Sequence, residues 1–226
     1  VGRIPMNDPS RILEVVRRII RYETTYPYSH PPKIFLHASK FVVDNDACAY
    51  LSMMRGFVPT PLIRSELCEM EFPRRDISLN EFVDSVNNTT IFWGFSHSNY
   101  RTFIVNLDST TVQFGIHDIF RLNTDSSPLV WLHIGCLVNS PNTNSVGNLI
   151  FKEGKSILSY GPQKESAPSV GINLVGNGLR GAYDDTSGFY AGLIDFYAKS
   201  YSASLGYIET YVYEGISYGL IGDPAL

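Results

Sequence analysis

A cysteine and a histidine each follow an apolar, strand-like segment of this sequence, at the point where the segment ends. Cys136 comes directly after Leu129–Gly135, and His97 follows Thr90–Gly94 by three residues. Parallel strands of an α/β sheet bring their carboxyl ends to one edge, so two neighbouring strands of this kind place the two side chains together. A thiolate beside an imidazole attacks acyl groups, and nearby backbone N–H groups stabilise the resulting oxyanion. The pair therefore predicts nucleophilic catalysis by cysteine.

Both residues also have an ordinary structural interpretation. A cysteine in an apolar strand is usually a small core side chain, and a loop histidine often bonds only to backbone. Alternation along the strand puts the His133 side chain on the face opposite to Cys136, so His133 is expected in the core or just behind the site. The other histidines, at positions 30, 37 and 117, have no partner at motif spacing, so no histidine metal site is predicted.

Strands and helices alternate along most of the chain, which predicts an α/β sandwich around a mostly parallel sheet. Helix starts are marked by Asp8-Pro9 and by the capping box Ser78–Glu81. Strands are expected at Val1–Pro5, Ile34–His37, Thr90–Gly94, Leu129–Ile134, Ser156–Tyr160, Thr210–Tyr213 and Gly219–Ile221, with a hairpin formed by Tyr100–Leu107 and Thr111–Phe114. Helices are expected after Asp8 and at Asp46–Arg55, Leu79–Val86, Ile116–Leu122, Ser145–Glu153 and Gly188–Leu205.

Length and composition exclude several classes of protein. The 226 residues suffice for one large domain or two small ones, and the chain, which opens at Val1, is interpreted as a piece of a longer precursor. Its net charge of −4 and scattered basic residues give no electrostatic footprint for nucleic acid. No apolar run reaches the ~20 residues of a membrane span. The three cysteines lack metal-type spacing, and if Cys48 paired with Cys68, Cys136 would be the free thiol.

Two further motifs suggest other ligands. Gly176–Gly181 matches G-x-G-x-x-G after a plausible strand at Gly171–Val175, which makes a dinucleotide-binding enzyme a third, weaker hypothesis. The acidic pairs Asp184-Asp185 and Asp44/Asp46 would suit a structural calcium ion, although solvated loop carboxylates are the default interpretation. No other cofactor is expected.

The ordered segments together resemble the catalytic domain of gingipain-type cysteine peptidases, in the clan shared with caspases and legumains. The resemblance is carried by Val1–Pro5 with Ile19–Glu23, by Ile91–Ser98, by Asp118–Leu122 with Pro128–Cys136, by Val146–Gly161 and by Leu220–Leu226. It implies a caspase-like three-layer sandwich with a mostly parallel central sheet. It also implies a single catalytic domain over 1–226, or an N-terminal subdomain over 1–75 and a catalytic subdomain over 76–226.

The resemblance assigns roles to individual residues. Cys136 would be the nucleophile, His97 its proton-handling partner, and the amides of Ser98 and Cys136 the oxyanion hole. The substrate would be a peptide or protein, and the location extracellular or at the cell surface. A basic side chain before the cleaved bond would need a buried acid, for which Asp44, Asp108 and Asp118 are candidates.

The sequence departs from the family pattern around both residues. Ser96 and Ser98 replace the glycines that usually flank the histidine, and Leu137 follows Cys136 where a glycine is often found soon after the nucleophile. These departures motivate the alternative that the domain is catalytically inactive and serves as a binding or surface-assembly module.

Overall fold

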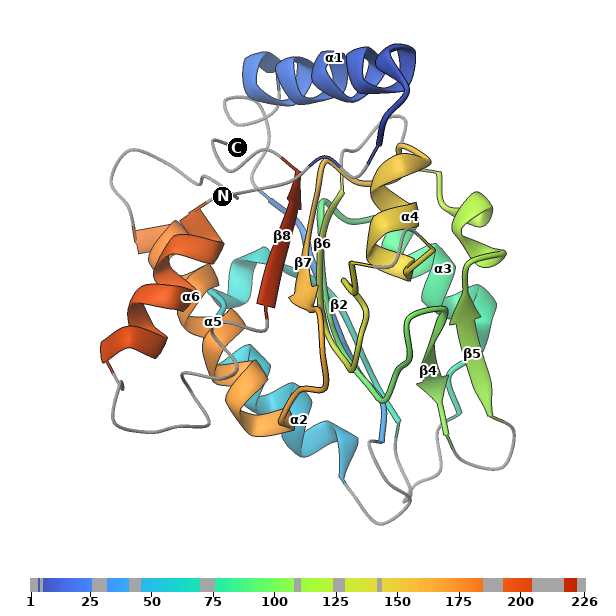
Figure 1. Cartoon of the computed structure of the whole chain (residues 1–226). Helices are drawn as coiled ribbons and strands as arrows, with labels where there is room; N and C mark the ends of the chain where they lie inside the picture. The colour runs from blue at the N-terminus through green and yellow to red at the C-terminus, as the bar shows by residue number, and fades with distance from the viewer. Residues whose placement is uncertain are drawn as a thin grey trace.

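A six-stranded sheet lies at the centre of the protein and is parallel except for its last strand (Figure 1). The computed structural model describes residues 4, 6–25, 32–40, 46–69, 76–107, 111–123, 129–141, 144–184, 193–204 and 218–222. In spatial order the strands are β2 (Ile63–Cys68), β1 (Ile34–Ala38), β3 (Ile91–Phe95), β6 (Val130–Ile134), β7 (Leu158–Pro162) and the antiparallel β8 (Tyr218–Gly222). The predicted α/β class with a mostly parallel central sheet is confirmed.

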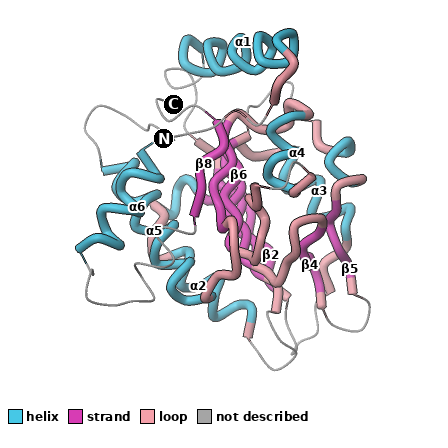
Figure 2. Tube along the Cα trace, in the orientation of Figure 1, coloured by secondary structure: helices cyan, strands magenta, loops and turns pink. Residues whose placement is uncertain are grey.

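Helices cover both faces of the sheet and make three layers (Figure 2). One face packs against α2 (Ala47–Arg55), α5 (Pro168–Asp184) and α6 (Leu193–Ser204); the other packs against α3 (Leu79–Asn87), α4 (Val146–Lys152) and the hairpin of β4 (Thr102–Asn106) and β5 (Val112–Gly115). Successive side chains of a strand point to opposite faces, so each strand contributes to both hydrophobic cores. Trp93 packs in the core beneath α2 and α5, and its neighbour Phe92 packs in the core beneath α3 and the hairpin.

The helix α1 (Pro9–Thr25) lies beside the amino edge of the sheet (Figure 1). It buries Val15 and Ile19, and Arg11 pairs at 3.7 Å with Glu153, which precedes the start of β7. The carboxyl ends of the parallel strands therefore lie at the opposite edge, away from α1. None of the described helices is both long enough and apolar enough to cross a bilayer.

Local sequence signals are confirmed at several element boundaries. The Ser78 hydroxyl accepts a hydrogen bond of 3.1 Å from the Glu81 amide at the start of α3, as a capping box requires. The Asp46 carboxylate caps α2 through the Cys48 amide at 2.9 Å. Cys48 and Cys68 form a disulfide between the first turn of α2 and the end of β2, which leaves Cys136 as the free thiol.

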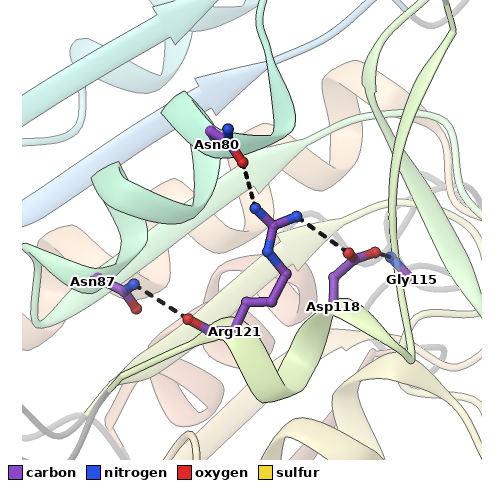
Figure 3. A network of polar contacts seen from close by, with 5 residues as sticks. All are labelled: Asn80, Asn87, Gly115, Asp118 and Arg121. Carbon is purple, nitrogen blue, oxygen red and sulfur yellow. Dashed lines mark hydrogen bonds and ion pairs between the residues drawn. The ribbon is translucent and has the colours of Figure 1, made fainter.

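The segment expected to be a helix at Ile116–Leu122 forms a 3-10 turn, η2 (Asp118–Arg121). Its Asp118 carboxylate accepts from the Gly115 amide at 2.9 Å and lies 3.5 Å from the Arg121 guanidinium (Figure 3). Arg121 in turn bonds to Asn80 of α3, and its carbonyl accepts from the Asn87 amide side chain. A second 3-10 turn, η1 (Thr60–Leu62), leads into β2.

The strand predicted at Gly171–Val175 is wrong, because these residues lie within α5. The G-x-G-x-x-G glycines lie further along the same helix, so they do not form a phosphate-binding turn after a strand. A Cβ added at Gly176 would meet the Phe57 ring, one at Gly178 the Ile194 carbonyl, and one at Gly181 the Tyr197 side chain. The glycines instead allow α5 to pack closely against its neighbours. The dinucleotide hypothesis required a strand followed by a glycine-rich turn, and this segment forms neither.

Several expectations fall outside the described residues. These are most of the Val1–Pro5 strand, the Thr210–Tyr213 strand, the first residues of the Gly188–Leu205 helix, and the side chains of His30, Asp44, Asp108 and Asp185. Within the described ranges, no group of three or more histidine, cysteine or acidic residues is arranged to hold a metal ion. The division into one domain or two subdomains stays a prediction.

Candidate active site

The strands that carry His97 and Cys136 are direct neighbours in the sheet. β3 and β6 run parallel in register, with Phe95 opposite Ile134. The Ser96 amide continues the pairing beyond β3 by donating to the Ile134 carbonyl at 3.0 Å. The two predicted residues therefore leave the same edge of the sheet from adjacent strands, which lie about 4.8 Å apart in such a sheet.

Both residues lie just beyond the sheet. Phe95 and Ile134, the last residues of β3 and β6, point into the core beneath α2 and α5, and His97 and Cys136 each lie two residues further along. Cys136 already belongs to the turn that follows β6. The His97 side chain is exposed and the Cys136 thiol is half-buried, so both are accessible from solvent.

The loops after β3 and β6 are bonded directly to each other. The Ser98 hydroxyl donates to the Cys136 carbonyl at 2.8 Å. Gly135 permits this contact, because a Cβ there would collide with the Ser98 side chain and come within 2.7 Å of the Ser96 carbonyl. The glycine before the cysteine is thus a close-approach position.

The hairpin holds the His97 loop from its other side. The His97 carbonyl accepts from the Ile104 amide, and the Asn99 amide donates to the Thr102 carbonyl, both at 2.9 Å. Ser98 lies between them in an antiparallel bridge to β4. Since consecutive residues of such a pair direct their amides to opposite sides, the Ser98 N–H points away from β4.

The Cys136 loop turns sharply after the cysteine. Leu137 has φ of 64°, in the left-handed region where side chains are disfavoured. The Leu137 amide donates to Lys164 and the Asn139 amide to Pro162, at 3.0 and 2.9 Å, which fixes the turn against the end of β7. Among the described residues, the amides of Ser98 and Cys136 have no backbone acceptor. Neither of these two amides is therefore used in backbone pairing within this part of the chain.

Two buried histidines lie behind the site, between the sheet and the hairpin. His133 Nε2 is 3.0 Å from the Ser96 hydroxyl, and His37 Nε2 is 3.1 Å from the Val105 carbonyl of β4. Burial lowers the pKa of His37 to about 4, although its bond to Val105 opposes the shift. Burial, with a smaller effect from His37, also holds the pKa of His133 well below its ordinary value. Both rings are neutral near pH 7, and His133 lies behind the site as expected.

Acid is expected to destabilise the protein through His37. The unfolded histidine takes up a proton below its ordinary pKa of 6.5, whereas the folded one resists until about 4. Stability is therefore lost as pH falls through this window, by up to about 3 kcal/mol. Urea unfolding from pH about 7 to about 4.5 should show a shallower decline in His37→Gln, which keeps a donor toward Val105 but does not titrate. Equal declines in both proteins would contradict the prediction.

Of the candidate pocket acids the structure describes Asp118, and it also describes two serines next to His97. The Asp118 carboxylate accepts from the Gly115 amide and pairs with the Arg121 guanidinium (Figure 3). It therefore serves the fold of η2. The serine side chains at 96 and 98 were not expected to make contacts. Only their place on either side of His97 could have signalled the hydrogen bonds that they make to His133 and to the Cys136 carbonyl.

Comparisons with known proteins give a consistent family. The model of peptidase family C25 matches residues 1–226. A complex of the pro- and mature domains of RgpB from Porphyromonas gingivalis matches with a TM-score of 0.73 at 11% identity, covering 100% of this chain and 55% of the other. The Arg-specific cysteine proteinase gingipain R (RgpB) matches with a TM-score of 0.71 at 11% identity, covering 100% and 54%.

A third structure, described as a protease, matches with a TM-score of 0.65 at 10% identity, covering 100% of this chain and 55% of its own. The chain thus spans little more than half the length of these matched structures. A search of curated proteins finds no match. At such low identity the structures show the fold, whereas the family model covers the whole sequence. The chain therefore belongs to peptidase family C25, the gingipain-type cysteine peptidases.

Proposed function

We propose that the protein is a cysteine endopeptidase that uses Cys136 as nucleophile and His97 as its proton-handling partner. The observation that carries the proposal is the direct bond between two loops at adjacent strand ends, one of which carries the free thiol of Cys136 and the other the exposed residue His97. This arrangement supports a site in which the two side chains act together. Family membership supplies the reaction class. The substrate would be a peptide or protein.

The steps follow from the chemistry of the two side chains. The Cys136 thiolate attacks the substrate carbonyl carbon, and the carbonyl oxygen takes up the electron pair as an oxyanion. The amides of Ser98 and Cys136 would donate to that oxygen. Protonated His97 gives its proton to the leaving amine as the C–N bond breaks. Water, deprotonated by His97, then attacks the thioester carbon, and the C–S bond breaks to release the acid and restore the Cys136 thiolate.

The disulfide of this chain bears on where the protein works. Disulfides persist in extracellular and surface proteins and are rare in the cytosol. The Cys48–Cys68 disulfide of this chain is consistent with secretion or display at the cell surface. It also simplifies any test of the nucleophile, since Cys136 is the one cysteine left to alkylate.

The alternative is a catalytically inactive domain that works by binding. It is motivated by the serines on either side of His97, which depart from the pattern of the family. In that case the Cys136 thiol would have no activating partner. Its reactivity would then equal that of the same thiol in the unfolded chain.

Thiol reactivity distinguishes the two functions. Native protein is treated with limiting iodoacetamide near neutral pH, and the modification of Cys136 is followed by mass spectrometry. The internal control is the same protein unfolded in urea with its disulfide intact. We expect the folded thiol to react at least about tenfold faster than the control, and the advantage to disappear in His97→Ala. Equal folded and unfolded rates would support the binding module and reject the peptidase.

A further inference from the structure

The serines on either side of His97 are both buried, although His97 itself is exposed. Along an extended segment, alternate side chains point to opposite faces. Ser96 and Ser98 therefore point one way while the imidazole points the other. Each serine hydroxyl makes a hydrogen bond to the chain segment that carries Cys136.

Ser96 is bonded to a side chain of β6. Its hydroxyl lies 3.0 Å from His133 Nε2, and both residues are fully buried. It is the only hydrogen-bond partner of the His133 ring among the described residues. The ring is held in place by Phe103 of the hairpin, with ring centroids 4.3 Å apart. Because this imidazole is neutral, it can share one hydrogen with the hydroxyl in either tautomer.

Ser98 is bonded to the backbone of the nucleophile itself. Its hydroxyl donates to the Cys136 carbonyl at 2.8 Å, across the gap that Gly135 keeps open. A glycine at position 98 would leave this carbonyl without the bond. The hydroxyl therefore holds the Cys136 backbone at a fixed distance from the His97 loop.

We propose that Ser96 and Ser98 are positioning residues that fasten the His97 loop to the Cys136 strand and so set the imidazole beside the thiol. The inference rests on the proposed peptidase function and adds the residues that maintain its geometry. Two bonds, one before and one after His97, define both the position and the tilt of the loop between them. In this chain they supply by hydrogen bonding a geometry that glycines would leave loose.

The test compares Ser96→Ala, Ser98→Ala and the double variant in peptide cleavage and in Cys136 alkylation. Alanine removes each hydroxyl but keeps the Ser98 amide that would bind the oxyanion. We expect kcat to fall roughly tenfold in each single variant and further in the double, since small displacements of a catalytic group are costly. KM should change less than about twofold, because substrate contacts are unaltered. The alkylation rate of Cys136 should fall in parallel with kcat.

Two further variants separate positioning from general stability. Ser98→Thr keeps the hydroxyl and should retain most of the wild-type kcat. Ser78→Ala removes a serine hydroxyl that caps α3 through Glu81 and should lower Tm with kcat unchanged. All rates are measured below the melting transition of every variant.

Unchanged kcat in both alanine variants, with Cys136→Ala still inactive, would overturn the inference and leave the peptidase standing. A loss in Ser78→Ala as large as in Ser98→Ala would also overturn it. A wild-type thiol that reacts no faster than in the unfolded chain would instead reject the proposed function, and the inference with it.

Discussion

Replacing Cys136 by alanine is expected to lower kcat for peptide cleavage by at least about 10⁴-fold while the protein stays folded. In the proposed mechanism the Cys136 thiol supplies the electron pair that attacks the carbonyl carbon. Neither Cys48 nor Cys68 can substitute, because both are in the disulfide. Cleavage would be measured on a labelled unfolded protein and on a peptide library, and the library would also identify the residue preferred before the cleaved bond.

Stability provides the control for this variant. The Cys136 side chain is half-buried at a loop, so its truncation should change the free energy of unfolding by less than about 1 kcal/mol. His97→Ala should also remove most activity, but the oxyanion donors at Ser98 and Cys136 would remain and leave some residual catalysis. Full cleavage by Cys136→Ala at unchanged stability would refute the assignment of the nucleophile.

The sequence was sufficient to predict the elements that position the site. Apolar runs ending at Gly94 and Gly135 marked two adjacent parallel strands, and the capping box at Ser78–Glu81 marked the helix before the first of them. These signals are local, because the burial of a strand and the first turn of a helix each depend on residues that are consecutive in the sequence. Family resemblance then linked the two strand ends.

Contacts between distant segments were not predictable in the same way. Gly171–Val175 has the composition of a buried strand, but its chain continues as α5 because the glycines beyond it fit against α6 and Phe57. Tertiary packing there outweighs the low helix propensity of glycine. The left-handed backbone at Leu137 likewise depends on bonds to Pro162 at the end of β7 and to Lys164 just after it, more than twenty positions away.

The serine contacts belong to this second class. Nothing in Ser96-His97-Ser98 reveals that one hydroxyl meets His133 and the other the Cys136 carbonyl, since these partners lie on β6 and in the loop after it. From the sequence alone, Ser96 and Ser98 show only that the two glycines of the family pattern are absent, which suggests reduced activity. With the contacts known, the same substitutions indicate a more rigid loop.

Gly135→Ala is expected to separate the two loops and to lower both the stability of the protein and its activity. The added methyl would collide with the Ser98 side chain and lie 2.7 Å from the Ser96 carbonyl, which belongs to the backbone and cannot rotate away. The His97 loop must therefore shift from β6 and release the Ser98–Cys136 bond. Overpacking of this kind destabilises by about 1–3 kcal/mol. A shift of about 1 Å in a catalytic group can cost about 10²-fold in rate.

Gly56→Ala is the matched control for this substitution. Gly56 follows α2 with φ of −61°, and its added Cβ would meet the Met53 carbonyl at 3.2 Å, a tight but tolerable distance. We expect its unfolding free energy to change by less than about 1 kcal/mol and its kcat to stay near wild type. The difference between the two variants isolates the effect of the close approach at position 135.

A second substitution tests whether the loop contact is the cause. Adding Ser98→Gly to Gly135→Ala removes the clash with the Ser98 side chain but leaves the one with the Ser96 carbonyl. Stability should recover in part, whereas kcat should stay low because the bond to the Cys136 carbonyl is still missing. Recovery of kcat together with stability would mean that the bond between the loops is dispensable, and that simple space at Gly135 is what the reaction requires.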